Sequence, residues 1–272
     1  MNVKHTVFAP PSGIITLLTD FGGADGFVGA MKGVMLGIHP QARIVDLTHE
    51  IAPQNISGGS FLLATHFKYF PAGTVHVAVV DPGVGTERKA LACYWREHYF
   101  IAPDNGLLDF CVEDASCVAL ALTRREYWRK EISHTFHGRD IFAPVAAHLA
   151  GGVAYAKLGE AYHLQPRGVA RTTRMEGNTL KGEIVYCDHF GNLISNISRN
   201  VFEKFVGQDS FEIRCAALSL KNTVAAYGFA RPGELVALMN SFERLELGVV
   251  QGNAQMKFAI QIGMPLTIKR GS

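Results

Sequence analysis

The stretch Ile14-Ile15-Thr16-Leu17-Leu18, followed by Thr19-Asp20-Phe21-Gly22-Gly23, decides the fold of the first part of this chain. The uncharged run predicts a buried β-strand, and the polar and glycine residues after it predict a sharp turn. Apolar side chains then recur at helical spacing until Pro40 ends the run, namely Phe27, Val28, Met31, Val34, Met35 and Ile38. The segment therefore predicts a strand that leads directly into a helix.

The same alternation continues along the chain. A short strand is expected at Arg43 to Leu47, a helix at Ile56 to Phe67, and a third strand at Thr74 to Val80. The third run is unbroken and rich in valine, which is typical of parallel strands buried on both faces. The pattern predicts a βαβαβ series and hence an α/β N-terminal domain.

Beyond about residue 170 the sequence changes to short alternating or β-branched runs separated by Gly, Asn and Asp. These runs are Gly182 to Tyr186, Phe211 to Arg214, Glu234 to Met239, Leu245 to Val250 and Pro265 to Lys269. They predict a smaller, mainly antiparallel β domain. We expect the N-terminal domain at residues 1–165, the C-terminal domain at 175–272, and a linker at 166–174 that contains Pro166 and Gly168.

Composition limits the function. The 272 residues are 48% hydrophobic and 18% charged, enough to bury one large or two modest cores. Soluble domains usually carry about 25% charged residues, so we expect part of the apolar excess in a subunit interface. The net charge is +2 and the 26 basic residues are scattered, which predicts a small-molecule ligand and no nucleic-acid partner.

The sequence gives no membrane or export signal. The longest apolar stretches, such as Val77 to Val80, are far shorter than the roughly 18 residues of a membrane-spanning helix. The first residues, with Lys4, His5, Pro10 and Pro11, lack the apolar run of a secretory signal. We therefore expect a cytoplasmic protein without membrane contact.

Familiar cofactor and metal motifs are missing from the sequence. The loop from Asp81 to Arg88 contains G-x-G but has Arg88 where a dinucleotide fingerprint needs its third glycine. No Gly-Lys-Ser/Thr loop, His-Glu-x-x-His or G-x-S-x-G occurs. The cysteines form no C-x-x-C pair and are expected to be reduced, mostly buried thiols: Cys93, Cys111, Cys117, Cys187 and Cys215.

Carboxylates follow the first three predicted strands. They are Asp20, Asp46 and Asp81, and ligands of open α/β sheets bind at the carboxyl ends of strands. Each aspartate alone is also explained as a helix or turn cap, and for Asp46 that interpretation is as good as a functional one. Together they indicate a polar site at this edge of the sheet.

The remaining polar residues lie in six short loops. They are Thr19 to Gly22, Asp81 to Gly85, Ala102 to Leu107, Phe136 to Asp140, Asp188 to Asn192, and Asn240-Ser241. In this order, from about Ile14 to Ile268, they resemble the S-adenosyl-L-methionine hydroxide adenosyltransferases, the water-using relatives of the bacterial fluorinase and chlorinase. The resemblance implies cleavage of S-adenosyl-L-methionine by water to adenosine and methionine.

The resemblance also implies an architecture. It predicts an α/β N-terminal domain and a β-barrel-like C-terminal domain, assembled as a homotrimer that binds its ligand between neighbouring subunits. No metal and no redox cofactor are expected.

The family's Asp-Arg-His set falls by resemblance on Asp81, Arg88 and His137. Water has a pKa of about 15.7, so an arginine can stabilise hydroxide character while a carboxylate and an imidazole hold the water and take its proton. Arg88 stays protonated and cannot itself be the base. The structural alternatives are that Arg88 neutralises Glu87 or another surface acid and that His137 caps a helix beginning near Asp140.

Substrate-binding positions also follow from the resemblance. Asp20 matches the residue that binds the ribose hydroxyls, and a carboxylate can accept two such hydrogen bonds. Asp188 and Ser241 match the positions that hold the amino and carboxylate ends of methionine. Asn192 and the backbone near Ala254 match the adenine-reading positions.

Aromatic residues complete the expected substrate site. Phe190 and Phe229 match aromatic walls, and Phe136 lies beside His137 in the fourth loop. Ordinary core packing is the alternative for the phenylalanines. Asp25 is also expected to bind substrate, although N-capping of the first helix explains it equally well.

The choice of water over halide rests on departures from the halogenases. Their halide pocket has a tyrosine in place of Asp81 and another hydroxyl-bearing aromatic in place of His137. Gly138 stands where the fluorinase has serine, but this position does not by itself separate the hydrolases from the chlorinase. A fixed carboxylate would repel halide. The extra loop of the fluorinase is also missing, because Cys93 to Ile101 leads directly from strand to turn to strand.

Two other functions stay open at this point. A metal-dependent hydrolase of a nucleoside-like substrate would use Asp20, Asp46, Asp81 and His137, if these side chains converge. A non-catalytic adenosine or S-adenosylmethionine sensor would keep the pocket without turnover.

Overall fold

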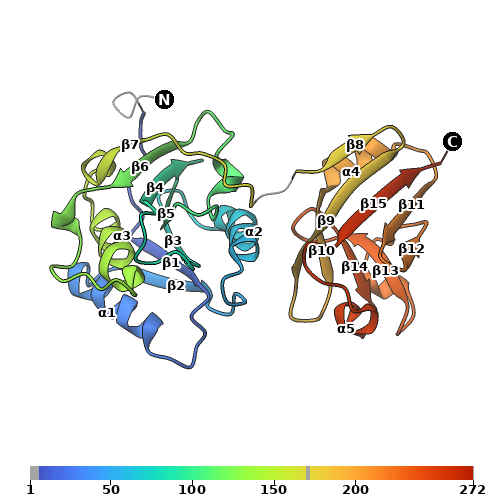
Figure 1. Ribbon diagram of the computed structural model, residues 1–272, viewed down its shortest axis with the longest axis horizontal. Coiled ribbons are helices and arrows are strands. Elements are labelled where there is room, and N and C mark those ends of the chain that lie inside the picture. The colour runs from blue at the N-terminus through green and yellow to red at the C-terminus, as the bar shows by residue number, and fades with distance from the viewer. Residues whose placement is uncertain (1–5, 170–171, 272) are drawn as a thin grey trace. The chain divides into compact units, whose positions relative to one another are not determined.

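In the computed structural model, the described residues are 6–169 and 172–271. The chain divides into two compact units, residues 1–170 and 171–272 (Figure 1). The expected linker at 166–174 includes residues 170 and 171, which lie outside the described part. The domain limits expected from sequence therefore stay a prediction.

The first unit is built on a seven-stranded sheet in the order β2-β1-β3-β5-β4-β6-β7. Its strands are β1 (Ile14–Thr19), β2 (Arg43–Thr48), β3 (Val75–Val79), β4 (Ala90–Trp95), β5 (His98–Pro103), β6 (Val118–Leu122) and β7 (Gly159–Tyr162). Its helices are α1 (Phe27–Ile38), α2 (Ile56–His66) and α3 (Ala143–Ala150). Strand β1 pairs in parallel with β2 and β3, and β3 in parallel with β5. The predicted βαβαβ series is confirmed, and the antiparallel β4, β6 and β7 make the sheet mixed.

Helices cover both faces of this sheet (Figure 1). On one face, α1 and α3 pack through Met31, Met35 and Val145 against Leu17 and Val77. On the other face, α2 packs through residues such as Leu63 against Leu18 and Val80, with Phe67 and Phe100. Alternate residues of β1 and β3 thus face opposite cores, which explains why their sequences are apolar without interruption.

A two-residue turn joins β4 and β5. Arg96 and Glu97 both have positive φ, 49° and 64°, as a tight hairpin of this length requires. The prediction that Cys93 to Ile101 leads directly from strand to turn to strand is confirmed.

The second unit is an antiparallel β structure that closes almost into a barrel. Its strands are β8 (Arg174–Glu176), β9 (Thr179–Cys187), β10 (Leu193–Ser198), β11 (Phe211–Cys215), β12 (Leu218–Leu220), β13 (Leu235–Met239), β14 (Arg244–Val249) and β15 (Pro265–Arg270). The main path is β12-β11-β15-β9-β10-β14-β13, with β8 beside β9. Two short helices, α4 (Arg199–Val206) and α5 (Ala254–Phe258), cover its core. The predicted antiparallel C-terminal domain is confirmed.

A helix that crosses a membrane must be both long and apolar. Within residues 6–169 and 172–271, none of the helices is both long and apolar enough to cross a bilayer.

Candidate active site

Asp81 lies directly beyond the end of β3, and its side chain is only 4% exposed. The neighbouring loop fixes the backbone at this point, because Asn105 donates from Nδ2 to the carbonyl of Val80 over 2.8 Å. Asn105 Oδ1 in turn accepts from the backbone N–H of Leu107. The sequence pointed to the loop of Asn105 without giving this residue a role.

Arg88 forms a bidentate ion pair with Asp81. Its Nε lies 2.9 Å from each carboxylate oxygen, and its Nη2 also donates to Oδ2. The Arg88 side chain is 9% exposed and its guanidinium lies 5.3 Å from the centre of the Phe142 ring. The alternative in which Arg88 neutralises Glu87 is therefore wrong, because the partner is Asp81.

A close backbone approach brings the loop of Arg88 against the segment that carries His137. Gly85 has φ +79°, and a Cβ atom there would lie 2.3 Å from the carbonyl oxygen of His134. Only glycine fits both the conformation and the space.

His137 completes the group. Arg88 Nη2 lies 2.9 Å from His137 Nδ1, and a guanidinium can only donate, so Nδ1 accepts and the neutral ring carries its proton on Nε2. Burial lowers the pKa of His137 below its ordinary value, as does the charge of Arg88, while Asp81 and Asp140 oppose the shift. Thus the structure favours the neutral imidazole.

The residues after His137 form a π-helical turn, Gly138–Phe142, that continues into α3. His137 precedes this turn without a side-chain capping bond, so the capping alternative is wrong. Asp140, fully buried, holds the segment in place by accepting from Arg129, Arg139 and the backbone N–H of Ser133. These bonds lower the pKa of Asp140 against the opposing effect of burial. Such turns are frequent at functional sites.

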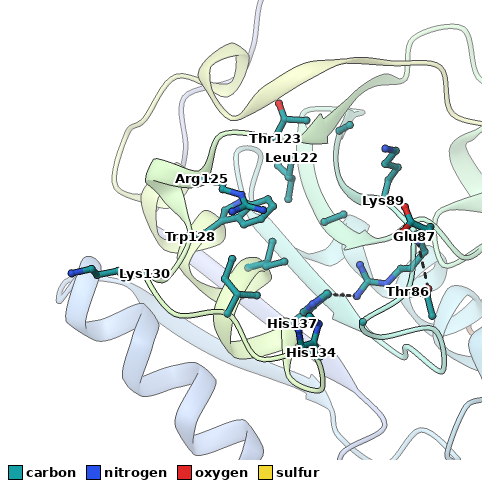
Figure 2. A pocket seen from close by; sticks show the side chains of 16 residues that line it. Thr86, Glu87, Lys89, Leu122, Thr123, Arg125, Trp128, Lys130, His134 and His137 are labelled. Atoms are coloured by element: carbon teal, nitrogen blue, oxygen red, sulfur yellow. Dashed lines mark hydrogen bonds between the residues drawn. The ribbon is translucent and has the colours of Figure 1, made fainter.

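A cavity of about 720 Å³ reaches Arg88 and His137. Figure 2 shows His137 and His134 together at one end of it and Lys89 and Glu87 along another wall. The other basic groups in its lining are Arg125 and Lys130, so the cavity carries a positive charge. It offers water and anions a route to the Asp81–Arg88–His137 group.

Phe136 forms an aromatic cluster with Phe21 and Phe27, and Asp20 precedes Phe21 in the chain. The rings of Phe21 and Phe27 lie 5.9 and 5.2 Å from that of Phe136. Asp20, after β1, accepts from the backbone N–H of Gln54 over 2.8 Å through Oδ2 only. Among the described residues, none donates a hydrogen bond to Asp20 Oδ1.

Asp25 is exposed in the turn before α1. The residue at the N-cap of this helix is Gly26, with no side-chain capping bond, so Asp25 does not act as the cap.

The four residues of the metal alternative do not form a metal-binding cluster, although Asp81 and His137 share Arg88 as a partner. Asp46 pairs with Lys32 at 2.6 Å and with His49 at 3.0 Å, and His49 in turn contacts Thr19. Asp20 and Asp81 have the separate partners given above. Across residues 6–169 and 172–271, no group of three or more His, Cys, Asp or Glu side chains is arranged to hold a metal ion.

In the second unit, Asp188 organises the loop between β9 and β10. Its Oδ1 accepts from the backbone N–H groups of Phe190 and Asn192, and Oδ2 accepts from Asn192 Nδ2, all over 2.9 Å. Ala254, fully buried at the start of α5, is next to this loop, because Gln255 N–H bonds to the carbonyl of Gly191. The structure thus brings Asp188, Asn192 and Ala254 together.

Phe190 and Phe229 are 71% and 76% exposed. Ordinary core packing is therefore the wrong interpretation for both. Aromatic side chains are enriched at interfaces between protein chains, and single exposed rings also occur on ordinary surfaces.

Ser241 is exposed in the turn between β13 and β14. Asn240 shapes this turn by accepting from the backbone N–H groups of Phe242 and Arg244. The buried Glu246 accepts from Asn240 Nδ2 over 2.8 Å and from Tyr227. Glu246 and Tyr227 were not expected from sequence, since a glutamate within a strand pattern gives no local signal of burial.

Two family models match the chain over most of its length. Residues 15–159 match the SAM hydroxide adenosyltransferase N-terminal domain, and residues 182–267 match the C-terminal domain of the same family. The chain belongs to the SAM hydroxide adenosyltransferase family. The resemblance inferred from its six loops is confirmed.

Individual relatives agree with the family. A protein of Salinispora tropica called (R)-S-adenosyl-L-methionine hydrolase is 36% identical over 96% of this chain and 99% of its own length. A fluorinase of Nocardia brasiliensis is 26% identical over 95% of this chain and 97% of its own. The crystal structure of an uncharacterized conserved protein from Thermotoga maritima has a TM-score of 0.85 and 36% identity, covering 94% of this chain and all of the other. The chain thus spans nearly the full length of these relatives.

Proposed function

We propose that the chain hydrolyses S-adenosyl-L-methionine to adenosine and L-methionine by in-line attack of water on the ribose C5′. The observation that carries the proposal is the hydrogen-bonded Asp81–Arg88–His137 group, in which the Asp81 and Arg88 side chains are nearly buried, in a chain of this family. The name of the Salinispora tropica relative supports the same substrate.

The three side chains divide the activation of water between them. Arg88 stays protonated and uses its donors on Asp81 and His137, so it fixes both partners and stabilises negative charge on the water oxygen. Because His137 Nδ1 is occupied, His137 faces the water with its Nε2–H and holds the oxygen. Asp81 has free lone pairs and takes the proton.

The bond changes at the ribose C5′ require no further catalytic group of the protein. The water oxygen forms a bond to C5′, the C5′–S bond breaks, and its electron pair goes to sulfur. Methionine leaves as a neutral thioether, so no general acid is required. The sulfonium loses its charge in the reaction, which a water-poor pocket favours.

Water reaches this group through the basic cavity beside Arg88 and His137. The carboxylate of Asp81 stands where a halide would otherwise have to approach, and it repels anions that the cavity attracts. Water is therefore the nucleophile in this proposal, and no metal takes part.

The substrate contacts in the proposal follow the family resemblance. We assign the ribose hydroxyls to Asp20, whose Oδ2 already bonds to Gln54 and whose other oxygen can accept. Asp25 and Phe136 line the same region in the proposal.

The second unit supplies the remaining contacts in the proposal. Asp188 and Ser241 bind the amino and carboxylate ends of methionine, while Asn192 and the backbone at Ala254 read adenine. The exposed rings of Phe190 and Phe229 stack on the ligand.

We further propose a cytoplasmic homotrimer in which neighbouring subunits share each ligand. The low charged fraction of 18% and the exposed Phe190 and Phe229 support buried surface in an assembly. Light scattering measures the assembly directly, and a fully active monomer would contradict the shared site.

Incubation of chelator-treated protein with S-adenosyl-L-methionine, followed by chromatography, tests the function. Equal amounts of adenosine and methionine without added metal are expected. Activity that returns only with a divalent cation would support the metal-dependent alternative, and ligand binding without turnover would support a sensor.

A further inference from the structure

Three of the five cysteines converge in the first unit, although they are distant in sequence and form no C-x-x-C motif. Cys93 lies in β4 and Cys111 ends a short turn at Asp109–Cys111, and both are fully buried. Cys117, just before β6, is half-buried and follows the exposed Ala115 and Ser116. The Sγ atoms of Cys111 and Cys117 lie 3.7 Å apart.

The segment between Cys111 and Cys117 is held by its own bonds. The backbone N–H of Asp114 bonds to the carbonyl of Cys111, and that of Cys117 to the carbonyl of Asp114. The Asp114 side chain accepts from Ser116 and from Trp95 Nε1 over 2.8 Å. The two sulfur atoms are therefore kept close by a fixed scaffold, as closure of a disulfide of about 2.05 Å requires.

We propose that Cys117 and Cys111 form an oxidant-responsive pair, in which Cys117 reacts first with a hydroperoxide and Cys111 then closes a disulfide. The Cys117 thiolate attacks one oxygen of the hydroperoxide, so that an S–O bond forms and the O–O bond breaks, giving a sulfenic acid at Cys117. The leaving alkoxide, or hydroxide from hydrogen peroxide, takes from solvent the proton that Cys117 released and departs as an alcohol or water. The Cys111 sulfur then attacks Cys117 Sγ, the S–O bond breaks, and the hydroxide released takes the Cys111 proton as water. Two thiols are oxidised and one peroxide is reduced.

Charge and exposure fit this order of events. A hydrogen bond from Cys111, with a further one from Cys93, lowers the pKa of Cys117 when these thiols turn toward it. Hydrogen bonds within the cluster and burial raise the pKa values of both Cys93 and Cys111 above the ordinary value, so both stay protonated thiols. The most accessible member of the cluster is thus also its nucleophile.

Cys187 provides a matched control within the same chain. It is half-buried like Cys117, but burial and Asp188 raise its pKa to about 11. At neutral pH it should react with hydrogen peroxide at least about ten times more slowly than Cys117, because the thiolate is the reactive form.

Peptide mapping of the unmodified protein tests the proposal. After treatment with hydrogen peroxide, alkylation and trypsin, residues 97–124 form one peptide that contains Cys111 and Cys117 and no other cysteine. This peptide should be found unalkylated and about two mass units lighter than its reduced form, and a thiol reductant should restore it. Cross-linking to the peptide of Cys93, or oxidation of Cys187 at the same rate, would overturn the proposal.

A variant separates the two steps. In Cys111→Ser, the sulfenic acid at Cys117 should persist and be trapped by dimedone. A Cys93–Cys117 disulfide in this variant, or absence of the adduct in a folded protein, would contradict the roles given to the two residues.

Discussion

Arg88 donates from Nη2 to Nδ1 of His137 over 2.9 Å while its Nε binds both oxygens of Asp81. One cation therefore fixes the orientation of a carboxylate and the tautomer of an imidazole. This relationship leaves His137 with Nε2–H as its free group, and it makes Asp81 the proton acceptor in the proposed reaction.

Asp81→Asn and His137→Ala should lower kcat by roughly 10²- to 10⁴-fold with little change in KM, because both residues act on the water. Ser241→Ala is the matched comparison from the substrate-binding set, and it should raise KM with little change in kcat. Steady-state kinetics separates the two classes. Near-normal kcat with only a raised KM in both Asp81→Asn and His137→Ala would show that neither residue activates water.

The pH dependence should report the neutral His137. Burial and Arg88 lower its pKa below the ordinary value of 6.5, so the active form persists below that pH and activity falls as the pH drops through the lowered pKa. The same shift makes its contribution to stability complete above pH 6.5 and lost as the pH falls toward the lowered pKa. Nitrogen-15 NMR of His137 should show the proton on Nε2 at neutral pH. A protonated ring or an Nδ1–H tautomer would be incompatible with the Arg88 bond.

Gly85→Ala should reduce activity by at least about tenfold and lower the melting temperature. The new Cβ would meet the His134 carbonyl at 2.3 Å in a backbone with φ +79°, so the loops carrying Arg88 and His137 must separate. Gly83→Ala is the control in the same loop, since its nearest atom lies at 3.5 Å. Thermal unfolding and kcat measure both effects, and equal behaviour of the two variants would refute the close-approach argument.

Asn105 is predicted to position Asp81. Asn105→Ala removes the hydrogen bond from Asn105 Nδ2 to the Val80 carbonyl. Because the free energy of roughly one hydrogen bond is lost, kcat should fall by about tenfold while KM is preserved. Asn105→Asp keeps the acceptor for Leu107 N–H but lacks the donor, so it should lose a similar amount of kcat. Full activity of Asn105→Asp would show that the donor to Val80 is unimportant.

The strands and helices around the site could be predicted because their signals are local. The uninterrupted apolar runs at Ile14 to Leu18 and Thr74 to Val80 indicate buried parallel strands, and β1 and β3 are observed there. The contact between Arg88 and His137 joins residues 49 positions apart, so no spacing rule reveals it, and only the family resemblance placed both in one site.

Other features depend on packing that sequence patterns do not record. The π-helical turn at Gly138–Phe142 gives no periodic signal in the sequence. Glu246 resembles an ordinary exposed strand residue in the sequence, although it is buried and accepts a hydrogen bond from Tyr227. Cys93, Cys111 and Cys117 come together only because β4, the Asp109–Cys111 turn and β6 are neighbours in the folded unit.

Hydrolysis in oxygen-18 water tests the central claim most directly. The protein is incubated with S-adenosyl-L-methionine in labelled water, and adenosine and methionine are analysed by mass spectrometry. Attack of water on C5′ predicts one labelled oxygen in the 5′-hydroxyl of adenosine and none in methionine. Unlabelled adenosine, S-adenosylhomocysteine as the product, or no turnover at all would contradict it.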